Sequence, residues 1–155
     1  MSSAQVADTG RGIAQFARVR PHLCWLAILA TLAACGNDTP DQKLAKDIHP
    51  ATSWASTLQF ASEVWLDNRV PSAFVRETVK AAQKAFDQAQ KAIDQSRASA
   101  QMRSDVAQQL RAATDAASEL QAAIRGGDRA AVGRARNRSA AAYQALRRIE
   151  DSHKQ

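Results

Sequence analysis

The sequence predicts an all-α fold, a small up-down antiparallel helical bundle of about four helices. Apolar and small residues recur at alternating intervals of three and four through most of the chain after residue 50. This spacing puts one apolar stripe on each helix, of the kind that packs as a coiled-coil-like seam. No segment alternates apolar and polar residues with the period of two that a strand requires. Proline at position 71 and paired glycines at 126 and 127 separate the stripes.

The first expected helix covers residues 51–68, where Trp54, Leu58, Ala61 and Trp65 lie on one face. Pro71 suits the first turn of the next helix, because its missing N–H is not needed there. It also disfavours helical backbone angles at the preceding residue, so the first helix must stop nearby.

The second stripe runs from Val75 to Ala100 and the third from Val106 to Ile124. Neither Gly nor Pro separates them, but the stripe loses phase between Ala100 and Val106. We therefore expect a break there, with Ser104 as the N-cap of the third helix. The alternative is one helix over residues 71–125, which would be about 80 Å long.

The last expected helix carries a stripe from Val132 to His153. Gly126-Gly127 is a typical C-terminal stop, and Asp128 is suited to cap the helix that follows. These boundaries give three long helices of about 23–27 residues after one shorter helix. Residues 104–150 contain 14 alanines, so the helices can approach closely while each residue buries little area.

The N-terminal region has a different pattern. Residues 1–22 are mostly polar with a net positive charge, and the next 12 residues, LCWLAILATLAA, carry no charge. A membrane-spanning helix needs about 20 apolar residues. A positive segment followed by a shorter apolar stretch is typical of a secretory signal peptide.

The end of that stretch, Leu32-Ala33-Ala34-Cys35, closely resembles the lipobox of bacterial lipoproteins. The resemblance covers residues 1–36 only. It implies lipidation of the Cys35 thiol, cleavage before Cys35, and acylation of the new N-terminus, for example by palmitate. The alternative is a cysteine that ends an ordinary signal peptide or a buried helix. Cys24 would be removed with the signal peptide.

The resemblance also suggests a location. In Gram-negative lipoproteins an aspartate after the cysteine favours retention at the inner membrane, and here that position is Gly36. We therefore expect a lipid anchor in the outer membrane, with the protein facing the periplasm. A Gram-positive host or the inner membrane is the alternative.

We divide the chain into a signal peptide (1–34), a lipidated N-terminus and polar tether (35–50), and a helical bundle (51–155). The tether contains Pro40 and Pro50 and room for a short helical turn around residues 41–48. Fully extended, residues 36–50 would reach about 50 Å, which would hold the bundle clear of the lipid surface.

Two groups of residues are candidate contact sites. Trp54 and Trp65 are expected in the core, because an aromatic stripe at helical spacing is usually buried. The alternative is an interfacial or ligand-facing apolar site. Arg134, Arg138 and Arg148 are candidates to bind phosphate or carboxylate groups on the envelope, although a run of charges is usually a solvated face.

The formal net charge of +6 fits an anionic neighbour, but an export signal argues against nucleic acid. His49 and His153 lie near opposite ends of the mature chain and have no partner ligand at metal-binding spacing. We expect no metal, no cofactor and no enzymatic activity. The expected function is a structural or interaction module whose partners are the membrane, an envelope protein, lipopolysaccharide, peptidoglycan or a second copy. The alternative is a periplasmic ligand-binding or stress-sensing module.

Overall fold

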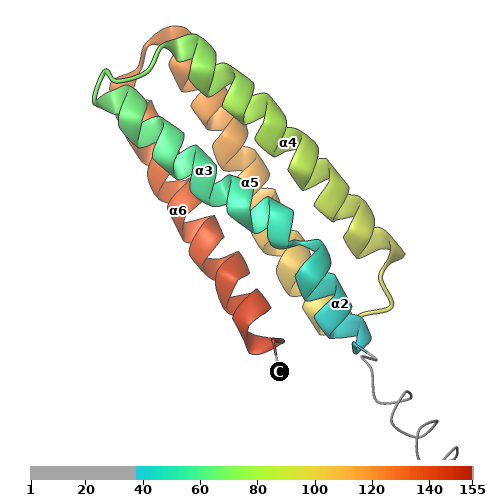
Figure 1. Ribbon diagram of the computed structural model, residues 1–155. Helices are drawn as coiled ribbons and strands as arrows, with labels where there is room; N and C mark the ends of the chain where they lie inside the picture. The colour runs from blue at the N-terminus through green and yellow to red at the C-terminus, as the bar shows by residue number, and fades with distance from the viewer. Residues whose placement is uncertain (1–37, 155) are drawn as a thin grey trace, which may run out of the picture. The chain divides into compact units, whose positions relative to one another are not determined.

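Four long helices run alternately up and down in the computed structural model, which describes residues 38–154 (Figure 1). They are α3 (His49–Leu66), α4 (Ser72–Gln95), α5 (Ala100–Gly126) and α6 (Arg129–Ser152), and the short α2 (Pro40–Asp47) precedes them. The described part of the chain contains no strand. The predicted all-α, up-down bundle is therefore confirmed.

The four long helices form a closed ring around one core. Each helix packs against its neighbours in sequence, and α6 packs back against α3. The predicted stripes supply the core, since their 3–4 spacing puts them on the inner face of each helix. Its largest fully buried apolar side chains are Phe86, Leu44, Ile48, Leu58, Leu120, Leu146, Val75, Val79, Val106 and Val132.

The bundle begins earlier in the chain than the sequence suggests. The predicted short helical turn around residues 41–48 is present as α2, but residues 40–50 form α2 and the start of α3 and belong to the bundle, whereas the sequence predicts a tether there. Thr39 caps α2 through a reciprocal capping box with Gln42, which satisfies two backbone N–H groups. Leu44 and Ile48 are 1% and 0% exposed. Their spacing of four places both on the side that faces the core, Leu44 within α2 and Ile48 directly after it.

Helix boundaries follow local chemistry, with one correction. The predicted break between the second and third long helices is confirmed, but the predicted cap at Ser104 is wrong. Ser99 caps α5 instead, accepting a hydrogen bond from the Met102 N–H at 3.2 Å. Gly127 ends α5 in the left-handed conformation (φ 68°), and Asp128 caps α6 by accepting from the Ala131 N–H at 2.9 Å, as predicted.

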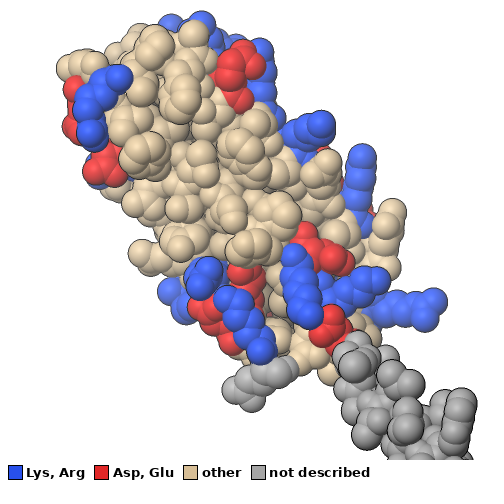
Figure 2. Space-filling model, in the orientation of Figure 1, with Lys and Arg blue, Asp and Glu red and all other residues tan. Residues whose placement is uncertain are grey.

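Charged side chains are unevenly placed on the surface. Figure 2 shows basic and acidic side chains together at the end of the bundle that carries α2, whereas the middle of this face is uncharged. The α3–α4 and α5–α6 connections lie at the opposite end (Figure 1). Figure 2 also shows basic and acidic side chains at that opposite end, so charges lie at both ends of this face.

Candidate ligand-binding pocket at the α2 end

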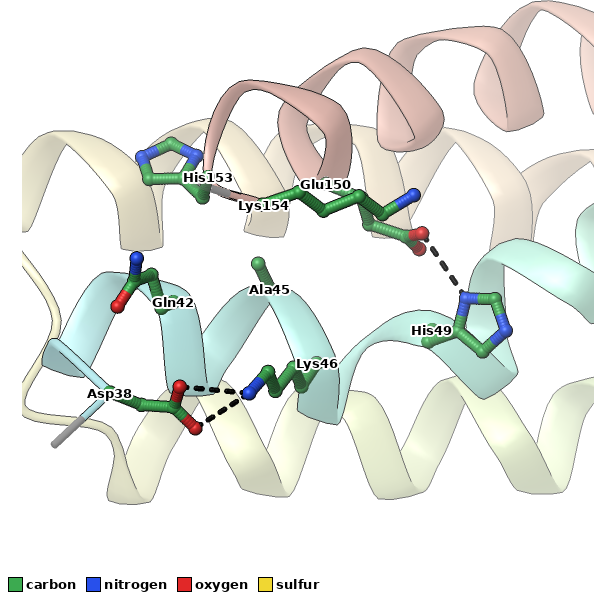
Figure 3. Close-up of a pocket in the computed structure, with 8 residues that line it drawn as sticks. All are labelled: Asp38, Gln42, Ala45, Lys46, His49, Glu150, His153 and Lys154. Atoms are coloured by element: carbon green, nitrogen blue, oxygen red, sulfur yellow. Dashed lines mark hydrogen bonds and ion pairs between the residues drawn. The ribbon is translucent and has the colours of Figure 1, made fainter. Parts of the chain in front are cut away.

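A pocket of about 450 Å³ lies where α2 and the start of α3 face the last turn of α6. Figure 3 shows the side chains that line it. We call it the end pocket. It is lined by Asp38, Gln42, Ala45, Lys46, His49, Glu150, His153 and Lys154.

Glu150 is the buried acid of the end pocket. It is 2% exposed, and it continues the inward stripe of α6 one turn beyond Leu146. Its Oε2 lies 3.1 Å from Nδ1 of His49, whereas its Oε1 is buried with no hydrogen-bond partner among residues 38–154. A buried carboxylate is costly unless its oxygens find donors. Glu150 is therefore an acceptor with unused capacity at the wall of the pocket.

His49 is held in place by the turn between α2 and α3. The preceding residue, Ile48, is fully buried and its N–H bonds to the Leu44 carbonyl at 3.1 Å. This anchor fixes the backbone next to it, so the His49 ring points toward Glu150 (Figure 3). The His49 side chain is 59% exposed, so the histidine of this pair is in contact with solvent whereas Glu150 is buried.

His153 lies beyond the C-terminal end of α6, on the same pocket. Its Nδ1 is 2.9 Å from the Ile149 carbonyl oxygen and 2.9 Å from the Ser152 hydroxyl. The two histidines thus line one pocket, although the sequence places them at opposite ends of the mature chain. Packing of α2 and α3 against α6 brings them together.

Asp41 fastens α2 to the start of α5 beside the pocket. Its carboxylate accepts hydrogen bonds from the Ser99 N–H at 2.7 Å and the Ser99 hydroxyl at 3.0 Å. The Ser99 N–H lowers the pKa of Asp41 most, partial desolvation opposes that shift, and the Ser99 hydroxyl and the charge of His153 add to it. The charged form of Asp41 therefore stabilises this end of the fold.

The two lysines of the end pocket have their own carboxylate partners. Lys46 Nζ lies 2.7 Å from Asp38 and Lys154 Nζ lies 2.6 Å from Asp151. Lys154 lowers the pKa of Asp151 most, partial desolvation opposes it, and Arg147 adds to the lowering. Both lysines are more than half exposed. The pocket therefore has a buried acid at its wall and exposed cations around it.

This arrangement suits binding better than metal coordination. Over residues 38–154, no group of three or more His, Cys, Asp or Glu side chains could hold a metal ion. The carboxylate of Glu150 can instead accept a hydrogen bond from an ammonium, guanidinium or hydroxyl group. The pocket therefore suits a ligand that carries a hydrogen-bond donor.

The predicted tryptophans do not share one site. Both are partly buried and pack against the core, about 16 Å apart along the α3 axis. Trp65 donates from Nε1 to the Ser72 hydroxyl at 3.0 Å, and the Arg129 guanidinium lies 5.6 Å from its ring centroid. Arg129 also donates to the Leu66 carbonyl. Trp65 thus helps to fasten the α3–α4 turn to the start of α6.

The three predicted arginines do not converge either. Arg134 and Arg138 line one groove with Glu119 and Asp128, and Arg138 forms an ion pair with Glu119. Arg148 lines another groove, next to Asp105, about 21 Å from Arg134 along α6. These arginines cannot act on one small anion together.

Sequence reasoning missed Glu150 as a site residue, although a signal was present. Leu146 is on the core stripe, and the residue four positions later shares its face. Ile149, one position before Glu150, is only partly buried. A charged residue in register with a buried leucine is the pattern that could have identified the pocket.

The lipidation prediction at Cys35 lies outside the described residues. Within residues 38–154 no helix is both long and apolar enough to cross a bilayer. Comparison of the chain with protein-family models, curated proteins and solved structures finds no match.

Proposed function

We propose that the chain is a bacterial envelope lipoprotein anchored through acyl chains on Cys35, and that its bundle is a non-enzymatic structural or interaction module. The sequence supports the anchor, because Leu32-Ala33-Ala34-Cys35 ends an uncharged stretch that follows a positive segment. Two or three acyl chains on one residue would make the anchor stable, whereas a single chain binds a membrane only marginally.

The position of α2 limits how far the bundle could lie from the proposed anchor. It begins at Pro40 and belongs to the bundle, so only residues 36–39 separate it from Cys35. Five residues of extended chain reach at most about 18 Å, far less than the 50 Å expected of a long tether. An anchor at Cys35 would therefore keep the α2 end near the lipid headgroups.

We place the anchor in the outer membrane with the bundle in the periplasm, on the basis of Gly36. The expected partners are an envelope protein, lipopolysaccharide, peptidoglycan or a second copy of the chain. Because Arg134 and Arg138 lie apart from Arg148, an anion contact there would need an extended polyanion rather than a small ligand.

A ligand-binding module is the second candidate function. Its support is the end pocket, in which a buried carboxylate oxygen has no hydrogen-bond partner among residues 38–154. This candidate is compatible with the lipid anchor, since the pocket lies at the α2 end.

Replacement of the proposed anchor residue tests the main proposal. Cys35→Ser should abolish incorporation of labelled palmitate and move the protein from the membrane to the soluble fraction. Cys24→Ser is the matched control, because it lies in the same N-terminal region but would be removed with the signal peptide. Membrane association and gel mobility unchanged by Cys35→Ser would refute the anchor.

A second variant tests the membrane assignment. Gly36→Asp should move the lipidated protein from outer- to inner-membrane fractions on a density gradient, and Gly36→Asn serves as the uncharged control. Inner-membrane fractionation of the unaltered protein would contradict the proposed location without affecting the anchor.

A further inference from the structure

We infer that the end pocket binds a primary ammonium group carried next to a phosphate, as in an aminoethyl phosphate headgroup. The Glu150 carboxylate would accept from the ammonium, and Lys46 and Lys154 would face the phosphate. The part of this inference that assigns the ligand to a membrane lipid rests on the proposed lipid anchor. The pocket chemistry itself does not.

The preference for a cationic donor follows from the wall of the pocket. Glu150 is only 2% exposed, and one of its carboxylate oxygens has no hydrogen-bond donor among the described residues. The last turn of α6 ends here, and the carbonyl groups at a helix C-terminus add partial negative charge. A charge-assisted hydrogen bond to a buried carboxylate is stronger than a neutral one.

The preference for a neighbouring anion follows from the pocket's other side chains. The exposed fractions of the Lys46 and Lys154 side chains are 68% and 54%, so both ammonium groups can move. Each is paired with an exposed carboxylate, and such surface pairs contribute little. A phosphate can therefore compete for both lysines without breaking a buried contact.

The inference requires exposed side chains of the pocket to rotate and give access to Glu150. Glu150 shares the pocket with His49 and Lys154, and both of these side chains are more than half exposed. Rotation of either side chain would expose more of the carboxylate while the backbone of α2, α3 and α6 stayed in place. The volume of about 450 Å³ falls within the range of small-molecule sites.

Titration of the full-length wild-type protein in non-ionic detergent, with labelled histidine rings observed by NMR, tests the inference. Phosphoethanolamine should give saturable shifts of the His49 and His153 rings. Phosphocholine is the matched control, because its trimethylated nitrogen has no N–H to donate. Ethanolamine should bind more weakly, and inorganic phosphate should not reproduce the His49 shift.

Glu150→Gln should weaken phosphoethanolamine binding about tenfold or more, since it removes the charge from the acceptor while keeping the side-chain size. Glu119→Gln, which removes an exposed carboxylate on α5, is the matched control and should bind as the wild type does. The wild-type titration remains decisive if Glu150→Gln does not fold.

Vesicles separate the two sources of the ligand. The Cys35→Ser protein should bind phosphatidylethanolamine vesicles over phosphatidylcholine vesicles if the source is a lipid, and only soluble phosphoethanolamine if it is not. Either result supports binding of phosphoethanolamine in the end pocket. Three results would overturn the inference. They are the absence of a His49 shift with phosphoethanolamine, equal binding of phosphocholine, and unchanged phosphoethanolamine binding by a folded Glu150→Gln variant. Failure of the anchor itself would appear only in the fractionation of Cys35→Ser.

Discussion

Nδ1 of His49 lies 3.1 Å from Oε2 of Glu150, a contact between residues 101 positions apart. It joins the first turn of α3 to the last turn of α6, next to the short helix α2. An exposed ring and a buried carboxylate meet in this pair. Burial of Glu150 dominates what this pair contributes to the free energy of folding, because only a few hydrogen bonds offset the desolvation of its carboxylate.

Glu150→Met should leave stability unchanged or raise the free energy of unfolding by about 1 kcal/mol, because a hydrophobic side chain of similar size needs no partner at a buried position. His49 loses its acceptor but is exposed enough to be hydrated. Urea denaturation of the variant and wild type checks this. Destabilisation by several kcal/mol would mean that the pair itself holds α3 to α6.

Leu44→Ala should destabilise the protein by about 2–5 kcal/mol, the usual range for a leucine lost from a core. Lys43→Ala is the control on the same helix, because its side chain is exposed, and it should change stability by less than about 0.5 kcal/mol. Thermal unfolding followed by circular dichroism compares the two. Equal melting temperatures would indicate that α2 behaves as a tether after all.

Stability should fall in acid partly through Asp41. Its pKa is lowered from 3.8 in the folded state, so it contributes stability that is present above pH 3.8. That stability is lost as the pH falls through the lower folded pKa. Asp151 shifts in the same direction.

Asp41→Asn should therefore be less stable than wild type near neutral pH, and the difference in stability should narrow as the pH falls below 3.8 through the lowered folded pKa. Ser99→Ala removes the cap and the hydroxyl partner of Asp41 but keeps the backbone N–H that lowers its pKa most, so it should give a smaller narrowing. Urea titrations at pH 7 and pH 2.5 measure both. A difference between Asp41→Asn and wild type that did not vary with pH would show that the charge of Asp41 is irrelevant.

Arg129→Gln should lower stability by about 1 kcal/mol, because it removes a cation–π contact with Trp65 as well as the hydrogen bond to Leu66. Arg125→Gln changes an exposed arginine at the other side of the α5–α6 turn and is expected to have little effect. Trp65 fluorescence in a Trp25→Phe, Trp54→Phe background should shift to longer wavelength only with Arg129→Gln. An unchanged spectrum would exclude the contact.

Much of the fold could be predicted from local pattern. The stripes of Val75 to Ile93 and Val106 to Ile124 specify one buried face per helix, and Gly127 and Asp128 specify a stop and a cap. Such signals act within a few residues, so they can be read from a single sequence. Ser99 and Ser104 show the limit of that reading, because both are good caps and only the geometry of the connection selects one.

The sequence by itself determined that this chain forms helices, where most of them end, and which residues face inward, because those properties depend on spacing and on backbone chemistry over one or two turns. Tertiary structure alone decided that α2 belongs to the bundle, that Arg148 stands apart from Arg134, and that His49, His153 and Glu150 share a pocket. Contacts between distant segments depend on which helix faces pack together, and a periodic pattern carries no information about which partner each face will meet.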